Sequence, residues 1–66
     1  MPIAILNIIE GRDLEKKRAL TNAVTEAICK SLDAPVQSVR VIINEMPKEN
    51  YAIAGELICD REAAKH

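Results

Sequence analysis

The sequence predicts a small α/β fold in which two parallel strands flank one long helix and a short C-terminal hairpin follows. Three observations support this fold class. An isoleucine-rich run of strand length covers residues 3–9, a helical apolar pattern covers residues 14–32, and a second β-branched run covers residues 39–45. Two strands joined by a single helix are normally parallel and connected by a right-handed crossover.

The first strand and the start of the helix are marked by the residues around them. Residues 3–9 lie between Pro2 and Gly11 and are too few for a helix of ordinary length. Asp13 is expected to cap the helix, because its carboxylate can accept a hydrogen bond from an amide of the first turn. Glu15 suits the positive end of the helix dipole.

The helix is predicted to run from Leu14 to about Leu32. Apolar residues recur there every three or four positions and should form one stripe facing the sheet. The segment 33–35 should end the helix, because the residue before Pro35 avoids the α region. The predicted stripe consists of Leu20, Ala23, Val24, Ala27, Ile28 and Leu32.

The second half of the chain is predicted to be a strand, a loop and an arm. The strand covers Val39–Glu45, the loop covers residues 47–50, and a hairpin over residues 51–58 bends at Gly55. Residues 60–66 are polar and are expected to be a frayed tail. Residues 1–66 are therefore interpreted as a single domain.

Both faces of the predicted sheet are largely apolar, which is typical of parallel strands that are covered on both sides. One helix can cover only one face, so the other face and the open strand edges need a second chain. The sequence thus predicts an obligate oligomer. Side chains of the first strand alternate between the two faces, with Ile3, Ile5 and Ile9 on one face and Ala4, Leu6 and Ile8 on the other. The second strand alternates in the same way, with Val39, Val41 and Ile43 on one face and Arg40, Ile42 and Asn44 on the other.

The size of the chain supports the same expectation. A chain of 66 residues buries only about 60% of its unfolded surface and usually needs disulfides, a metal or self-association for stability. The two cysteines, Cys29 and Cys59, follow no secretory signal, so reduced thiols and a cytoplasmic location are expected. The single histidine, His66, and two distant cysteines match no metal-ligand spacing. Self-association therefore remains as the expected source of stability.

Charge and composition argue against two classes of partner. The net charge is −1 and the pI is about 5.7, whereas nucleic-acid-binding domains usually carry a basic face. The basic cluster 16–18 is interpreted as a solvated helix face, and Tyr51 is the only aromatic residue available for stacking on bases. No apolar run approaches the roughly 20 residues of a membrane span. We expect neither nucleic-acid nor membrane binding.

Pro2 is the first candidate for chemistry. Removal of Met1, which is normal when the next residue is small, would leave a secondary amine at the start of the first strand. A free α-amino group titrates at about 7.7–8.0, and an apolar pocket or nearby cations would lower that pKa further. A general base works best when its pKa lies near the operating pH. If Met1 stayed in place, the nitrogen would be an amide without basicity.

Two arginines are the next candidates. Arg12 lies in the turn after the first strand, and Arg40 lies near the start of the second strand within an apolar run. Each could form a surface salt bridge, or the pair could bind carboxylates, because a guanidinium matches a carboxylate with two parallel hydrogen bonds. The sequence pairs none of the remaining reactive side chains with a catalytic partner. The cysteines are therefore interpreted as unreactive thiols and the glutamates as solvated carboxylates. They are Cys29, Cys59, Glu10, Glu45 and Glu56.

Several segments, taken together and in order, resemble the 4-oxalocrotonate tautomerase family. The resemblance covers the chain through Leu57 without gaps. Each segment alone is a weak signal, and the set with this spacing is a strong one. The segments are Pro2-Ile3-Ala4, Glu10-Gly11-Arg12, Ser31-Leu32-Asp33-Ala34-Pro35, Ser38-Val39-Arg40-Val41-Ile42-Ile43, Glu45-Met46 and Ala52-Ile53-Ala54-Gly55-Glu56-Leu57.

The resemblance implies a fold, an assembly and a set of roles. The family uses a short β-α-β subunit and assembles it as a hexamer, a trimer of dimers. Pro2 would be the general base, Arg40 would bind the carboxylate and enol oxygen at the reacting end, and Arg12 would hold the distal carboxylate. In the family such arginines reach the proline from neighbouring subunits. Tyr51 would replace an aromatic pocket residue that is usually phenylalanine. The rest of the implied apolar lining is Ile9, Met46 and Ile53.

The resemblance also implies a reaction. In the family, 2-hydroxymuconate is converted to 2-oxo-3-hexenedioate during bacterial breakdown of aromatic compounds, without a metal or organic cofactor. The sequence departs from the family pattern at Ala54, where glycine is expected, and at Tyr51, whose hydroxyl is additional.

Two alternatives remain open on the sequence. The first is a related enzyme with different chemistry: a promiscuous phenylenolpyruvate tautomerase, or a decarboxylase or dehalogenase-like member. The second is a non-catalytic assembly subunit. The presence of both Arg12 and Arg40 favours a dicarboxylate substrate and ranks the first alternative second.

Overall fold

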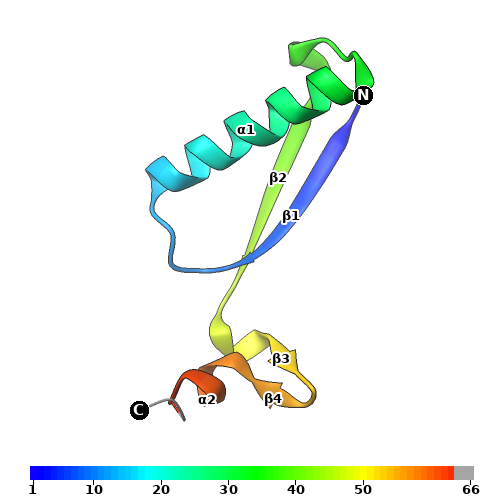
Figure 1. Ribbon diagram of the computed structural model, residues 1–66. Coiled ribbons are helices and arrows are strands. Elements are labelled where there is room, and N and C mark those ends of the chain that lie inside the picture. Colours follow the sequence, from blue (N-terminus) through cyan, green and yellow to red (C-terminus); the bar gives the residue numbers. More distant parts are fainter. Residues whose placement is uncertain (64–66) are drawn as a thin grey trace.

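The computed structural model describes residues 1–63 and shows a β-α-β unit followed by a small arm (Figure 1). The predicted α/β fold class and the order of its elements are confirmed. The helices and strands are β1 (Ile3–Ile9), α1 (Leu14–Leu32), β2 (Arg40–Met46), β3 (Ala52–Ile53), β4 (Glu56–Leu57) and α2 (Ile58–Ala63), with 3₁₀ turns η1 (Val36–Ser38) and η2 (Lys48–Asn50).

β1 and β2 form a two-stranded parallel sheet, as expected for a single-helix crossover. The register pairs Ile3 with Arg40 at one end and Ile9 with Met46 at the other. The amide of Glu10 donates to the Met46 carbonyl over 2.9 Å and extends the ladder beyond β1. β2 begins and ends one residue later than the sequence predicts, which is within the usual variation of strand boundaries.

Helix α1 crosses one face of this sheet, and both of its ends follow the prediction (Figure 1). An Asp13 carboxylate oxygen accepts a hydrogen bond from the Lys16 amide over 2.9 Å, which confirms the N-cap. The helix ends at Asp33, whose φ of 55° is left-handed and stops the helical hydrogen-bond pattern.

The face that α1 turns towards the sheet differs in part from the predicted stripe. Ala23, Ala27 and Leu32 are exposed, whereas Thr21, Thr25 and Cys29 are half-buried and share the packed face with the predicted members Leu20, Val24 and Ile28. The apolar pattern missed the threonines because it treats them as polar. The γ-methyl group of threonine packs against apolar surface like that of valine, which has the same shape.

None of residues 1–63 that can be assessed for burial is buried, and the apolar side chains on the outer face of the sheet are open. Ile3 is 57% exposed, Ile5 58% and Ile42 46%. The accessible surface is 5124 Å², against about 4,200 Å² for a folded monomer of this mass. The radius of gyration is 15.5 Å, against about 11 Å for a compact domain of this length.

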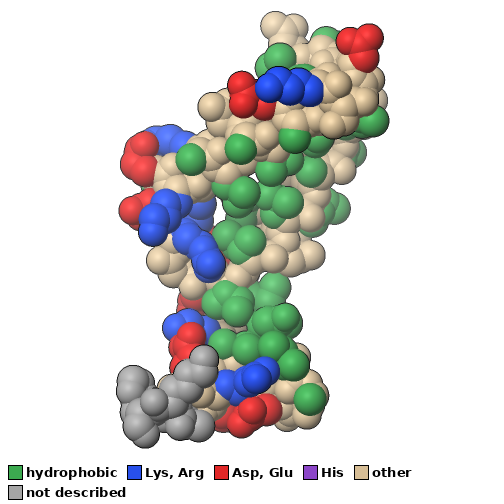
Figure 2. Space-filling model, in the orientation of Figure 1, with side chains coloured by type: hydrophobic (Ala, Val, Ile, Leu, Met, Phe, Trp, Pro, Cys, Tyr) green, Lys and Arg blue, Asp and Glu red, His purple; other side chains and the backbone are tan. Residues whose placement is uncertain are grey.

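These values describe a subunit that lacks a core of its own. Hydrophobic side chains are visible beside α1 and continue down to the arm (Figure 2). Exposed apolar surface of this kind marks an interface with another chain, so the structure supports the argument for self-association made from the strand faces.

The arm contains the expected hairpin. β3 and β4 pair antiparallel, and the two residues between them, Ala54 and Gly55, have φ values of 54° and 83°. Positive φ at both positions is typical of the two-residue turn that matches the twist of a hairpin. The arm is closed by the amide of Ile58, which donates to the Tyr51 carbonyl over 2.8 Å.

The expectation of a frayed tail from residue 60 is wrong over residues 60–63, which belong to α2. Two ion pairs hold this short helix against the arm. They join Lys48 to Glu62 at 2.6 Å and Arg61 to Glu56 at 3.5 Å. Residues 64–66 lie outside the described part of the chain. Among the helices of residues 1–63, none has the length and apolar content needed to cross a bilayer.

We expect Ile5→Asp to abolish self-association, because it places a carboxylate in the centre of the exposed apolar face, next to Ile42. Sedimentation velocity at micromolar concentration should show loss of the assembly, and circular dichroism should show unfolding. Asn22→Asp adds the same charge at an exposed position of α1 and should leave the assembly intact. A folded monomer of the unaltered chain would contradict the argument.

We expect Ala54→Gly to stabilise the protein by about 0.5–1 kcal/mol, because glycine occupies a positive φ without the Cβ clash that alanine suffers. Denaturant titration at fixed protein concentration measures the change in unfolding free energy. The matched change Gly55→Ala introduces that clash at φ 83° and should destabilise. Equal effects of the two substitutions would be incompatible with this explanation.

Candidate active site

Pro2 and Arg40 lie together at the amino end of the sheet. The Arg40 amide donates to the Pro2 carbonyl over 2.9 Å, which places the start of β1 beside the start of β2. Pro2 is half-buried, and the Met1 that precedes it is 79% exposed. With Met1 attached, the Pro2 nitrogen belongs to a tertiary amide and has no basic lone pair.

The Arg40 guanidinium is exposed, and within residues 1–63 it contacts only backbone groups. Its Nη1 donates to the carbonyl of Gln37 over 2.7 Å and approaches that of Val39 at 3.4 Å. Neither contact neutralises the positive charge, so the guanidinium retains its full attraction for an anion. A charged side chain beside open apolar sheet residues is a suitable place for a carboxylate.

Arg12 lies at the opposite end of the sheet, in the turn between β1 and α1. Its Nη1 donates to the Ile9 carbonyl over 2.9 Å, which folds the side chain back along the end of the strand. The turn is positioned by the Asp13 cap and by a 2.5 Å ion pair between Lys17 on α1 and Glu45 on β2.

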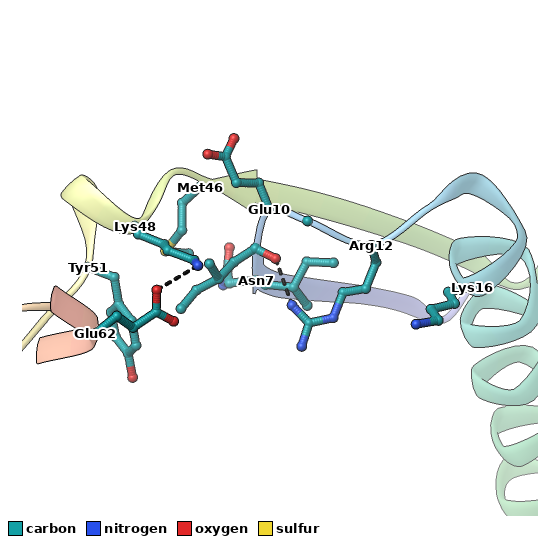
Figure 3. A pocket seen from close by; sticks show the side chains of 11 residues that line it. Asn7, Glu10, Arg12, Lys16, Met46, Lys48, Tyr51 and Glu62 are labelled. Carbon is teal, nitrogen blue, oxygen red and sulfur yellow. Dashed lines mark hydrogen bonds and ion pairs between the residues drawn. The ribbon is translucent and has the colours of Figure 1, made fainter. Parts of the chain in front are cut away.

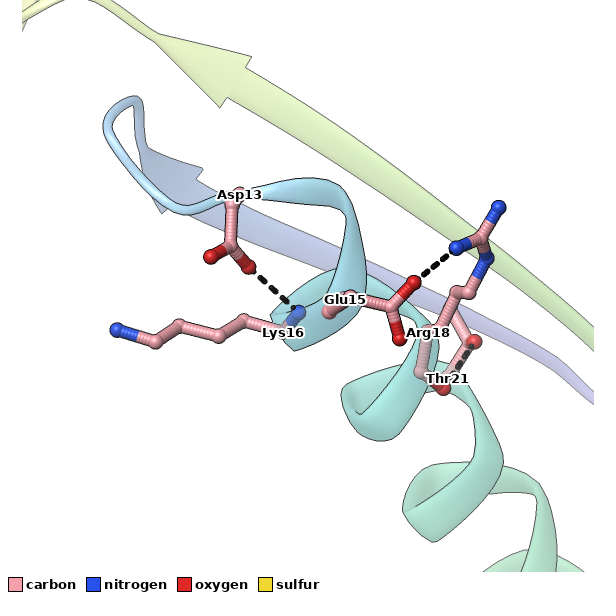
Figure 4. Close-up of polar contacts among 5 residues, drawn as sticks. All are labelled: Asp13, Glu15, Lys16, Arg18 and Thr21. Atoms are coloured by element: carbon pink, nitrogen blue, oxygen red, sulfur yellow. Dashed lines mark hydrogen bonds and ion pairs between the residues drawn. The ribbon is translucent and has the colours of Figure 1, made fainter.

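The first turns of α1 are further tied by local contacts (Figure 4). Glu15 pairs with Arg18, and the Thr21 hydroxyl donates to the Arg18 carbonyl over 3.0 Å. These contacts lie on the helix surface and contribute little stability individually. None of them involves Arg12.

A groove of about 880 Å³ opens at this carboxyl end, between the sheet and the arm (Figure 3). It brings together four of the residues singled out from the sequence, Ile9, Arg12, Met46 and Tyr51. The groove therefore combines an arginine with apolar and aromatic surface, which suits an organic anion. The other residues that line it are Asn7, Ile8, Glu10, Gly11, Lys16, Lys48 and Glu62.

The remaining candidates are not brought into this groove. Ile53 lies in β3, 44% exposed, and is not part of the lining. Ile3 and Ile9 are about 20 Å apart along β1, because a strand rises about 3.3 Å per residue. Pro2 and Arg12 of one chain are thus too far apart to contact one small substrate.

Three charged groove residues were not predicted from the sequence as site residues: Lys16, Lys48 and Glu62. Lys16 was assigned to a solvated helix face, although its position one helical turn after Arg12 could have indicated a shared site. Glu62 had no usable signal because its segment was expected to be frayed. Within residues 1–63, no cluster of three or more metal-ligating side chains was found.

Comparison with known proteins decides the family. Residues 2–61 match the family model described as tautomerase enzyme. The 2-hydroxymuconate tautomerase of Stutzerimonas stutzeri is 59% identical over 56 residues, which are 85% of this chain and 89% of the relative. The chain belongs to the 4-oxalocrotonate tautomerase family. It is a tautomerase, an isomerase that interconverts keto and enol forms.

Solved structures agree with the fold of this tautomerase. A 4-oxalocrotonate tautomerase isozyme from Methylibium petroleiphilum superposes with a TM-score of 0.93 at 41% identity, over 96% of this chain and 98% of that one. A subunit of the heterohexameric 4-oxalocrotonate tautomerase from Chloroflexus aurantiacus gives 0.88 at 30% identity, over 91% and 97%. The resemblance stated from the sequence and the tautomerase-like fold are confirmed.

Proposed function

We propose that this tautomerase converts 2-hydroxymuconate to 2-oxo-3-hexenedioate, with the nitrogen of Pro2 as the general base after removal of Met1. The observation that carries the proposal is the placement of two arginines at opposite ends of one sheet, Arg40 beside Pro2 and Arg12 in the groove that Ile9, Met46 and Tyr51 also line. If two copies bring these unlike ends together, the arginines suit a substrate with a carboxylate at each end. The similarity to 2-hydroxymuconate tautomerase supports the same substrate.

The proposed site is composite. Since the ends of one sheet lie about 20 Å apart, the Pro2 end of one copy must meet the Arg12 end of another. We propose a homohexamer built as a trimer of dimers, in which residues 1–66 form one tautomerase domain. The heterohexameric relative and the open outer face of the sheet support this assembly. The absence of a membrane-crossing helix among residues 1–63 is compatible with a cytoplasmic location, which we also propose.

In the proposed mechanism, the Pro2 amine takes the proton of the enol hydroxyl and returns a proton to a distant carbon. The enol oxygen becomes the ketone oxygen as the electron pairs shift along the conjugated chain. Arg40 binds the adjacent carboxylate and that oxygen, so its positive charge stabilises the dienolate where negative charge develops. Arg12 holds the far carboxylate. No metal or organic cofactor takes part in this scheme.

The apolar lining has a role in the same scheme. Ile9, Met46 and Tyr51 surround the groove, and Ile53 on the arm would reach the site from a neighbouring subunit. Apolar surroundings disfavour the charged ammonium form and would lower the pKa of the Pro2 amine. A base of lower pKa is unprotonated in a larger fraction of molecules at neutral pH.

We expect Pro2→Ala to lower kcat for 2-hydroxymuconate, because a primary amine that is free to rotate replaces the secondary amine fixed in the ring; the loss should be at most about 10²–10⁴-fold, the usual contribution of one positioned base. Stopped-flow absorbance measures turnover, and sedimentation should show an unchanged assembly. Intact-mass analysis is the control, because Met1 must be absent from both proteins. Unchanged turnover would eliminate proline as the base and favour another mechanism.

We expect Arg40→Ala mainly to lower kcat and Arg12→Ala mainly to raise KM. Arg40 would contact the atoms where charge develops, whereas Arg12 would contact a carboxylate whose charge is constant during the reaction. Steady-state kinetics on 2-hydroxymuconate and on the monoacid phenylenolpyruvate separate the two effects. The reverse pattern would exchange the roles, and higher efficiency of the unaltered enzyme on the monoacid would favour a phenylenolpyruvate-type activity.

A further inference from the structure

The groove at the carboxyl end of the sheet contains more positive charge than Arg12 alone provides. Lys16 and Lys48 also line it, together with the carboxylates of Glu10 and Glu62. The charge available to a ligand depends on which of these groups are already paired.

Lys48 is neutralised within the chain. Its Nζ lies 2.6 Å from Glu62 Oε2, and this ion pair is drawn across the arm side of the groove (Figure 3). A cation that already has a carboxylate partner offers little attraction to a second one. The pair also accounts for the charge of Glu62. The Glu10 carboxylate points away from the Arg12 guanidinium (Figure 3).

Lys16 and Arg12 have no such partner in the described part of the chain. The Arg12 guanidinium donates to the Ile9 carbonyl, which is neutral, so this contact does not compensate the positive charge of Arg12. The Lys16 ammonium makes no ion pair with residues 1–63; its side chain extends past the Asp13 carboxylate, which accepts the Lys16 backbone amide (Figure 4). In Figure 3 both cationic side chains lie on the same side of the groove.

Two uncompensated cations at one groove wall repel each other, and an anion between them removes the repulsion. We infer that Lys16 is a second binding residue for the distal carboxylate of the substrate, acting beside Arg12 and conferring preference for dicarboxylates. The inference rests on the proposed function, since it assigns the far end of that substrate. Lys16 is remote from the reacting end and contributes to binding only.

The position of Lys16 suits this role. It lies in the first turn of α1, which Asp13 caps, so its backbone is fixed relative to Arg12. The ammonium group is exposed and its long side chain can adjust to one carboxylate oxygen while the guanidinium binds the other. An exposed pair of this kind contributes modestly, which corresponds to about a two- to fivefold change in affinity.

The test compares Lys16→Gln with the unaltered enzyme on 2-hydroxymuconate and phenylenolpyruvate. We expect KM for the dicarboxylate to rise about two- to fivefold with kcat unchanged, and the monoacid kinetics to remain the same. Lys16→Arg should restore KM, because it returns the charge. Lys30→Gln is the matched control, since Lys30 is exposed in the last turn of the same helix, about 21 Å along its axis from Lys16.

A binding measurement keeps this inference separate from the reaction itself. Muconate, a dicarboxylate of the same length without the enol hydroxyl, can be titrated calorimetrically into each variant. Weaker binding to Lys16→Gln alone supports the inference even if 2-hydroxymuconate is not turned over, an outcome that would overturn only the proposed function. Equal affinity of all variants, or no binding of muconate to the unaltered enzyme, would overturn the inference.

Discussion

The structure depends on one constraint: a two-stranded parallel sheet has two apolar faces, and a chain with one long helix can cover only one of them. α1 packs on the face that carries Ala4, Leu6 and Ile8. On the opposite face, Ile3, Ile5 and Ile42 each leave more than 40% of their surface exposed to solvent. Burial of that face in a partner would supply the hydrophobic free energy that a 66-residue chain cannot obtain alone.

The same constraint explains how so short a chain can form an enzyme site. A single sheet places Pro2 and Arg40 at its amino end and Arg12 at its carboxyl end, about 20 Å apart. The proposed association of copies would cover the open face of the sheet and could also bring unlike ends together. Stability and catalysis would then depend on the same interfaces, and a substitution that weakens the assembly would lower activity even when it is remote from substrate.

The fold was predictable from local signals, and the site only in part. The isoleucine-rich strands, the Asp13 cap and the Ala54-Gly55 bend each depend on neighbouring residues, and all three occur as expected. Arg12 and Tyr51 lie in one groove because of the position of the arm. The hydrophobic periodicity of the sequence does not determine that position.

Helix α2 shows why the rest could not be predicted. Its six residues are too few to be a stable helix in isolation, so intrinsic propensity carries little information. Ion pairs join the segment to residues earlier in the chain, Glu56 with Arg61 and Lys48 with Glu62. The second pair also removes the charge of Lys48 from the groove. A tail that appeared irrelevant in the sequence thereby determines which cations of the site remain available to an anionic ligand.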